Sequence, residues 1–248
     1  MKRLRNNIFA TAAVAVACIL GTTSAKAQEF TVQGDLVSSY VWRGVYQTGA
    51  SFQPTLGFSI GDFSVTAWGS TDFDGNKSSE GLASKEIDLT AAYTLGESGP
   101  TLSVASLWWA GQGAGKYFNF KSHETAHFFE AGLAYTLPCE KLPLSMAWYL
   151  MFAGADKNEE GKQNYSYCEL NYPFSVKSVD LNATVGFVPY KTYTVGYGNS
   201  GFAFTNVALK ATTAIRITDS FSLPIFAQAI WNPCLEDAHL VFGITLKP

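Results

Sequence analysis

From residue 30 onward the sequence divides into segments of about ten residues in which apolar and polar side chains alternate. Alternation with a period of two is typical of β-strands that expose two different faces. The expected strands cover residues 30–43, 52–60, 63–72, 85–95, 101–110, 125–137, 142–153, 165–175, 179–188, 203–217, 221–231 and 239–247. No helical period interrupts them, so the chain is expected to be all-β.

The connections between these segments are alternately short and long. The tight ones read "GD", "GESGP", "PCEK", "VKS" and "TDS", whereas the long ones include "DGNKSSEGLAS", "AGQGAGKYFNFKSHE", "GADKNEEGKQN" and "PYKTYTVGYGNSG". A soluble β-sandwich has no reason to keep this alternation, but a transmembrane barrel has short periplasmic turns and long extracellular loops. The sequence therefore predicts an antiparallel transmembrane β-barrel of about 12 strands.

The two faces of the expected strands differ in the way that a lipid-embedded barrel requires. In segment 179–188 one face is apolar and the other small and polar; the first carries Val179, Leu181, Ala183, Val185 and Phe187, the second Asp180, Asn182, Thr184 and Gly186. A half-buried soluble strand has the same period. The apolar face is free of charge in nearly every strand, which favours contact with lipid.

The low proportion of charged residues supports a membrane environment. Charged residues make up 15% of the chain, against about 25% in an ordinary soluble domain. The formal net charge of −3 argues against nucleic acid as a partner. We expect outer-membrane lipid and small polar solutes as partners, and a monomer.

The N-terminal segment resembles a secretory signal peptide. A basic "MKRLRNN" precedes the short apolar run "IFATAAVAVACILG", and small residues precede the expected cleavage after Ala27. Residues 1–27 are therefore predicted to be removed, residues 28–248 to form a single outer-membrane barrel domain, and the cell outer membrane to be its location.

The first expected strand ends in "SSYVWRG", which combines two aromatic residues with an arginine. If the strand runs to residue 43, Tyr40 and Trp42 lie on the apolar face at its upper end, where barrels carry an aromatic girdle. Arg43 then faces the lumen, where a carboxylate can meet it. The expected girdle comprises Tyr40, Trp42, Trp108, Trp148 and Trp231.

Charged residues on the polar faces are the candidates for the lumen. They are Arg43, Asp35, Asp72, Glu86, Asp88, Glu130, Glu169, Asp180, Lys210 and Arg216. A barrel of about twelve strands is wider than one that side chains fill completely and narrower than a porin. We therefore expect a narrow channel or a binding barrel for small polar solutes, with a weak cation preference because acids outnumber bases. An inward loop such as 111–124 could close it.

The segment "SSYVWRG", followed by "QPTLGFSIGDFSVTAWGS", resembles a family of uncharacterised bacterial exported proteins. Members of that family open with a strand of the form Y-V-[FW]-R-G and continue with amphipathic strands. The resemblance covers about the first 45 residues after the signal. It implies an outer-membrane β-barrel and supplies no catalytic residue.

Two other functional classes remain open from the sequence. A lipid-modifying outer-membrane enzyme could use "SHETAH", which contains His123 and His127, although this is not the HExxH motif of a helical zinc site. A soluble exported lipocalin-like ligand-binding barrel would need only eight strands. The sequence predicts no catalytic residue, no metal site and no cofactor, and the chain is not expected to be an enzyme.

Overall fold

The computed structural model describes residues 28–73, 85–110, 116–122, 124–156, 165–194 and 196–248, and the predicted signal peptide over residues 1–27 lies outside them. No helix among these residues is long and apolar enough to cross a membrane. The strands are β1 (Gln28–Val37), β2 (Tyr40–Trp42), β3 (Val45–Thr48), β4 (Ser51–Ile60), β5 (Phe63–Asp72), β6 (Lys85–Thr94), β7 (Thr101–Ala110), β8 (His127–Thr136), β9 (Ser145–Gly154), β10 (Ser166–Val176), β11 (Val179–Val188), β12 (Ala203–Arg216), β13 (Ser222–Asn232) and β14 (Asp237–Leu246).

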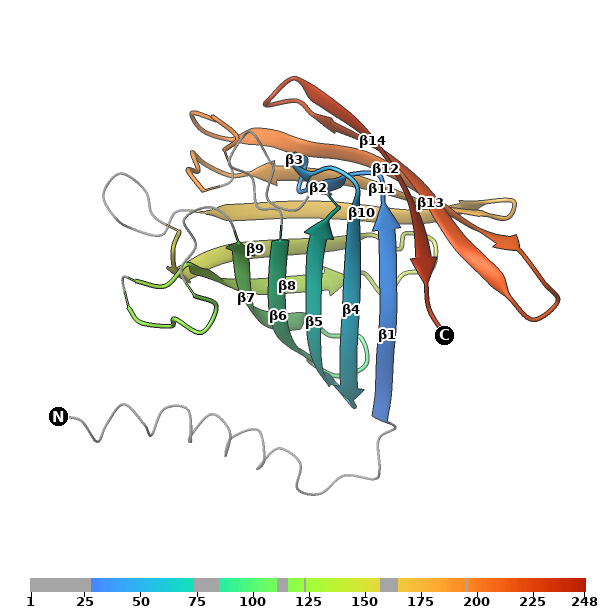
Figure 1. Cartoon of the computed structure of the whole chain (residues 1–248). Coiled ribbons are helices and arrows are strands. Elements are labelled where there is room, and N and C mark those ends of the chain that lie inside the picture. Colours follow the sequence, from blue (N-terminus) through green and yellow to red (C-terminus); the bar gives the residue numbers. More distant parts are fainter. Residues whose placement is uncertain (1–27, 74–84, 111–115, 123, 157–164, 195) are drawn as a thin grey trace.

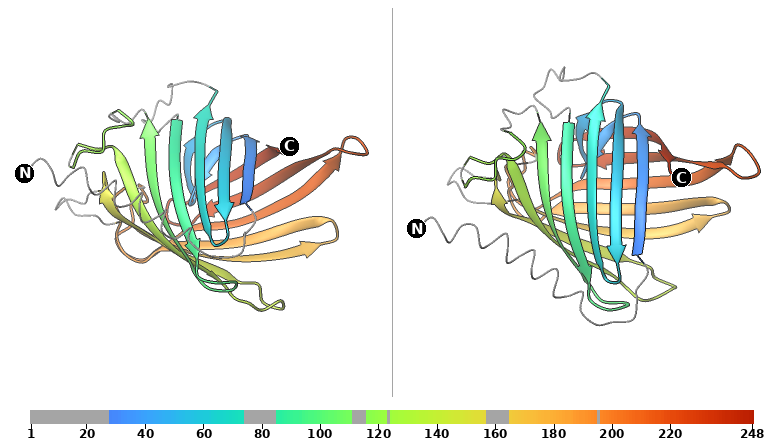
Figure 2. Two further views of the ribbon diagram at one scale, coloured as in Figure 1. Left: turned by 90° about the horizontal axis from the view of Figure 1, so that it is seen from below. Right: turned by 60° about the horizontal axis from the view of Figure 1, so that its bottom comes forward.

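Twelve of the strands in the described residues close into one antiparallel barrel (Figure 1; Figure 2). β1 pairs with β4, each later strand pairs with the next along the chain, and β14 returns to β1. This arrangement confirms the predicted all-β fold and its strand number. Because neighbouring strands are antiparallel, the strand ends next to the tight connections lie at one end of the barrel, and those next to the long connections lie at the other.

The expected first strand, residues 30–43, is wrong beyond Val37. The chain leaves the barrel wall at Ser38, and β2 and β3 pair with each other in a separate two-stranded sheet. Their turn consists of Arg43 and Gly44, which have φ values of 50° and 85°. Positive φ at both turn residues is the geometry of a type I′ hairpin. We call residues 38–50 the lumen hairpin.

The lumen hairpin is packed inside the barrel near the long-loop end. Trp42 and Val45 contact a buried cluster that includes Met151, Tyr165 and Tyr197. The side chains of Tyr165 and Met151 are almost completely shielded from solvent. The hydrophobic core of this protein therefore lies in the lumen, between the hairpin and the wall.

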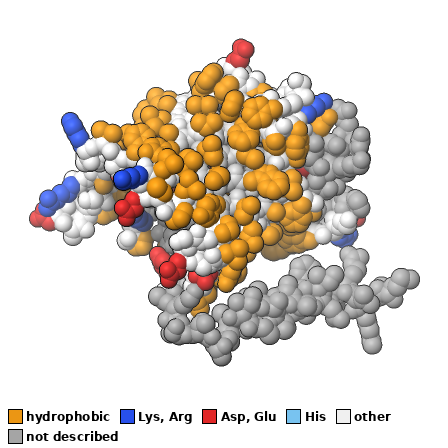
Figure 3. Space-filling view, turned by 180° about the vertical axis from the view of Figure 1, so that it is seen from behind, with side chains coloured by type: hydrophobic (Ala, Val, Ile, Leu, Met, Phe, Trp, Pro, Cys, Tyr) orange, Lys and Arg blue, Asp and Glu red, His pale blue; other side chains and the backbone are white. Residues whose placement is uncertain are grey.

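The outer wall of the barrel is apolar and open to its surroundings. Phe30, Leu240 and Phe242 are 73%, 58% and 55% exposed, and each lies in the outward phase of its strand. Figure 3 shows apolar side chains covering most of one face of the barrel, with charged side chains near its margins. A continuous apolar surface of this size on a closed barrel is typical of contact with lipid.

Candidate functional site

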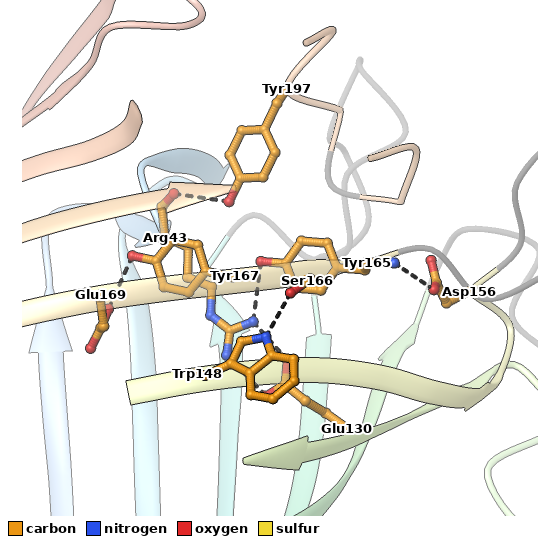
Figure 4. Close-up of polar contacts among 9 residues, drawn as sticks. All are labelled: Arg43, Glu130, Trp148, Asp156, Tyr165, Ser166, Tyr167, Glu169 and Tyr197. Carbon is orange, nitrogen blue, oxygen red and sulfur yellow. Dashed lines mark hydrogen bonds and ion pairs between the residues drawn. The ribbon is translucent and has the colours of Figure 1, made fainter. Parts of the chain in front are cut away.

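Arg43 forms a buried ion pair with Glu130 across the lumen. Its two terminal nitrogens donate to Oε2 and Oε1 of Glu130 over 2.6 and 2.9 Å (Figure 4). The two side chains are only 9% and 7% exposed. Paired donors on a planar guanidinium match the two oxygens of a carboxylate, so this contact fixes both the position and the orientation of Arg43.

Four aromatic rings surround the same guanidinium. Its central carbon lies 4.5, 4.3 and 4.7 Å from the ring centres of Trp42, Tyr149 and Tyr167. Tyr165, whose ring centre is 5.5 Å away, also accepts a hydrogen bond of 3.1 Å through its hydroxyl oxygen. Cation–π contacts of this kind strengthen when water is excluded. We call Trp42, Tyr149, Tyr165 and Tyr167 the arginine cage.

The electrostatics of the cage keep Arg43 charged. Burial is the largest single influence and lowers the pKa of Arg43, but the charges of Glu130 and Tyr165 and their hydrogen bonds to the guanidinium together raise this pKa well above its ordinary value. The lumen hairpin therefore carries a permanent positive charge into the interior of the barrel.

The backbone at the tip of the lumen hairpin is held as firmly as the side chain. The hydroxyl of Tyr197 donates a hydrogen bond to the backbone carbonyl oxygen of Arg43 over 3.1 Å. The side-chain amide of Asn232 donates one to the backbone carbonyl oxygen of Gly44 over 3.0 Å. Tyr197 belongs to the long connection after β11, whereas Asn232 ends β13. With Glu130 on β8, these contacts tie the hairpin to three separate parts of the barrel.

Gly44 is required where it stands. Its φ of 85° is unfavourable for other residues, and a Cβ there would overlap the backbone carbonyl of Thr205. Gly44→Ala is expected to destabilise the barrel by about 2 kcal/mol or more, measured as a lower urea midpoint of unfolding. Gly198→Ala is the matched control, because Gly198 has a φ of 63° but open space around it. Equal midpoints for the two variants would contradict this account.

Several predicted lumen residues do face the interior of the barrel. Glu86 and Asp88 lie on β6 behind the lumen hairpin, where Glu86 is 3% exposed and one oxygen of each carboxyl is buried without a hydrogen-bond partner among the described residues. Farther toward the short-turn end, Asp35 accepts a 2.6 Å hydrogen bond from Thr245. The ammonium of Lys210 lies 4.0 Å from the ring centre of Phe226.

Glu169 is connected to the arginine cage through one of its members. The hydroxyl of Tyr167 donates to Glu169 over 3.0 Å (Figure 4). Asn171 donates to the other oxygen of the same carboxylate over 2.9 Å. The polar groups of the lumen therefore continue from the cage along β10.

Three of the predicted lumen residues are not brought into this site. Asp72 is the last residue of β5 at the long-loop end. Asp180 is exposed and accepts a hydrogen bond from Ser175, and Arg216 is exposed and paired with Asp219 beside a short turn. Their positions at the strand ends separate them from the arginine cage.

The predicted aromatic girdle is wrong for Tyr40 and Trp42. Tyr40 is 8% exposed and packs on Trp68 inside the barrel, and Trp42 belongs to the arginine cage. The reason is that the chain turns inward at Ser38, so the outward phase of β1 does not continue. Trp148 and Trp231 are 48% and 53% exposed on the outer wall.

Trp108 and His127 also lie on the outer side of the wall, under a loop. Tyr117 contacts both side chains, with ring centres 5.3 Å from Trp108 and 5.1 Å from His127. Tyr117 and Phe120 of the expected closing loop therefore lie against the outer wall, and the lumen hairpin lies in the interior instead. His123 lies outside the described residues, which contain no group of three or more metal-ligating side chains.

The tyrosines of the arginine cage and the two backbone clamps were not predicted from the sequence. The available signal is that Tyr149 and Tyr167 are aromatic residues in the inward phase of β9 and β10, and that Tyr165, directly before β10, has the same phase as Tyr167. Tyr197 and Asn232 carry no comparable signal, because one lies in a loop and the other at a strand end.

Comparison with known proteins adds a resemblance in overall shape. No family model and no curated protein matches the chain. A solved structure described as "Asymmetric conductivity of engineered proteins" has a TM-score of 0.36 and 11% identity over 85% of this chain, which spans 62% of that one. Two mutants of the Rh. blastica porin each have a TM-score of 0.38 with this chain, at sequence identities of 10% and 11%. The two alignments cover 92% of this chain, and 78% and 79% of the porin chains. The fold described above rests on this chain's own strand pairing.

Proposed function

We propose that this chain is an outer-membrane barrel that admits small polar solutes, and that Arg43 and Glu130 form its constriction. The observation that carries the proposal is a buried, fully paired charge centre in the lumen of a barrel whose outer wall is apolar. A barrel that only filled space would need no guanidinium at its centre, because burying charge is costly.

The outer wall and the connections support the location. An exposed apolar wall is unsuited to a soluble lipocalin-like barrel and suited to lipid. The alternation of short and long connections supports short turns in the periplasm and long loops outside the cell. The signal-like residues 1–27 and the resemblance of "SSYVWRG" to exported barrel proteins support export.

The charges of the lumen support a preference for cations. Arg43 is already neutralised by Glu130, so the remaining inward charges decide the preference. Asp35 and Glu169 line the interior on the short-turn side of the constriction, with Lys210 as an opposing cation. The carboxyl groups of Glu86 and Asp88 face the interior behind the lumen hairpin. Excess carboxylate in a confined lumen attracts cations and repels anions.

The test is conductance of the purified protein in planar lipid bilayers under a potassium chloride gradient. We expect small, stable channels that prefer potassium over chloride by about twofold to tenfold, because only a few charges set the selectivity. Asp35→Asn combined with Glu169→Gln is expected to lower the preference, whereas Asp219→Asn, at an exposed short turn, is expected to leave it unchanged. Absence of conductance at every voltage would contradict the proposal.

A further inference from the structure

A serine and a histidine lie together on the outward face of the barrel, away from the lumen. Ser106 shares the outward phase of β7 with Leu102 and Val104, which are 48% and 52% exposed. His127 begins β8 in the outward phase of that strand, and its side chain is completely shielded from solvent. An ionisable side chain at a lipid-facing wall is costly, which makes it a candidate for function.

The hydrogen bonds of His127 determine where its proton lies. Nε2 is 2.5 Å from the carbonyl oxygen of Tyr117, and Nδ1 is 2.8 Å from Oγ of Ser106. A carbonyl oxygen can only accept, so Nε2 carries the hydrogen of the neutral ring. Nδ1 is then an acceptor, and Ser106 donates to it. A hydroxyl bound to a base that a third group orients is the arrangement of an activated nucleophile.

Aromatic rings shield this pair from bulk solvent, and a donor without a hydrogen-bond partner lies on the same face of β7. The ring of Phe120 stacks on His127 with centres 4.5 Å apart, and Tyr117 covers its edge. Trp108 lies two residues from Ser106 on the same face, and its indole Nε1 is buried without a hydrogen-bond partner among the described residues. A preorganised, unpaired N–H is what stabilises the negative oxygen that forms during acyl transfer.

We propose that Ser106 and His127 form a hydrolytic site for acyl esters of membrane lipids, with Trp108 as the oxyanion donor. The apolar side chains of Leu102 and Val104 continue from Ser106 along the outer wall, where an acyl chain can lie against them. The inference goes beyond solute passage through the lumen and relies on the proposed membrane location only for the source of the substrate.

The reaction has two balanced halves. Oγ of Ser106 attacks the ester carbonyl while its proton passes to Nδ1 of His127, and the bond to the alcohol breaks as the alcohol leaves with that proton. A water molecule then attacks the acyl-serine, its proton passes through Nδ1 to Oγ of Ser106, and the fatty acid is released. The sum is ester plus water giving a carboxylic acid and an alcohol.

The experiment uses the full chain in detergent micelles with a fluorophosphonate probe, which reacts with activated serines, and with phosphatidylethanolamine as substrate. We expect a phosphonate adduct on Ser106 by mass spectrometry and release of free fatty acid. Ser106→Ala is expected to abolish the adduct and to slow hydrolysis by about a thousandfold or more.

The control is Ser103→Ala, which removes an inward serine from the same strand and is expected to keep both the adduct and the rate. Heat-modifiable gel mobility verifies that each variant is a folded barrel. A folded wild-type protein that forms no adduct at Ser106, or a Ser106→Ala variant that hydrolyses at the wild-type rate, would overturn the inference. Because the assay needs no ion gradient, its outcome is separate from that of the conductance test.

Discussion

Replacing residues 38–50 by the dipeptide Asn-Gly is expected to raise single-channel conductance about tenfold or more, because it removes the lumen hairpin from a twelve-strand barrel. Val37 and Ser51 are register partners on β1 and β4. A two-residue type I′ turn can therefore join them without disturbing the wall. The measurement is conductance in planar bilayers, compared with the wild type at the same salt concentration.

The matched control shortens another connection at the same end of the barrel. Thr71 and Lys85 are register partners on β5 and β6, so residues 72–84 can also be replaced by Asn-Gly. This variant keeps the lumen hairpin and is expected to conduct like the wild type. A folded barrel without the hairpin that conducts no better than the wild type would show that the hairpin is not the obstruction.

Glu130→Gln is expected to lower the free energy of unfolding by about 3–5 kcal/mol, because it leaves a buried guanidinium without its counterion. The aromatic rings of the arginine cage cannot replace a carboxylate that binds through both oxygens. Unfolding in urea, followed by tryptophan fluorescence in detergent micelles, measures the change. A variant that unfolds at the wild-type midpoint would contradict the assignment of Glu130 as the partner of Arg43.

Two further variants separate the ion pair from general effects of substitution. Asp219→Asn removes the partner of the exposed Arg216 and is expected to change the unfolding free energy by less than about 1 kcal/mol. Arg43→Met combined with Glu130→Gln removes the buried charge itself. This double variant is expected to be more stable than Glu130→Gln alone, since the cost of the unpaired guanidinium is gone.

The wall of the barrel could be predicted because its pattern is local. Each strand alternates apolar and polar residues over about ten positions, and each turn is marked by its own residues. Continuing the phase of β1 past Ser38 wrongly predicts that Tyr40 and Trp42 lie on the outer face. The dipeptide Arg43-Gly44, flanked by the apolar residues Trp42 and Val45, instead indicates a tight hairpin turn at this point.

The site could be predicted only in part because its contacts are distant in sequence. The sequence predicts that Arg43 meets a lumen carboxylate. The alternation of apolar and polar residues indicates which face of a strand a residue occupies, but it does not indicate the position of that residue along the barrel axis. To identify Glu130, rather than Glu86 or Asp88, as the partner of Arg43, the register of every intervening strand pair must be known. The cage tyrosines are inward aromatic residues whose convergence on one guanidinium depends on the same registers.

The position of the lumen hairpin constrains the order in which this protein can assemble. The hairpin follows the first strand, yet its partners lie 87, 154 and 188 residues farther along the chain, at Glu130, Tyr197 and Asn232. Contacts of such long range form late, since the loops that separate them must first be closed. The later strands must therefore assemble around the hairpin before these contacts can form, and docking of β14 on β1 encloses it. Ring closure and locking of Arg43 are thus expected to be one slow kinetic phase.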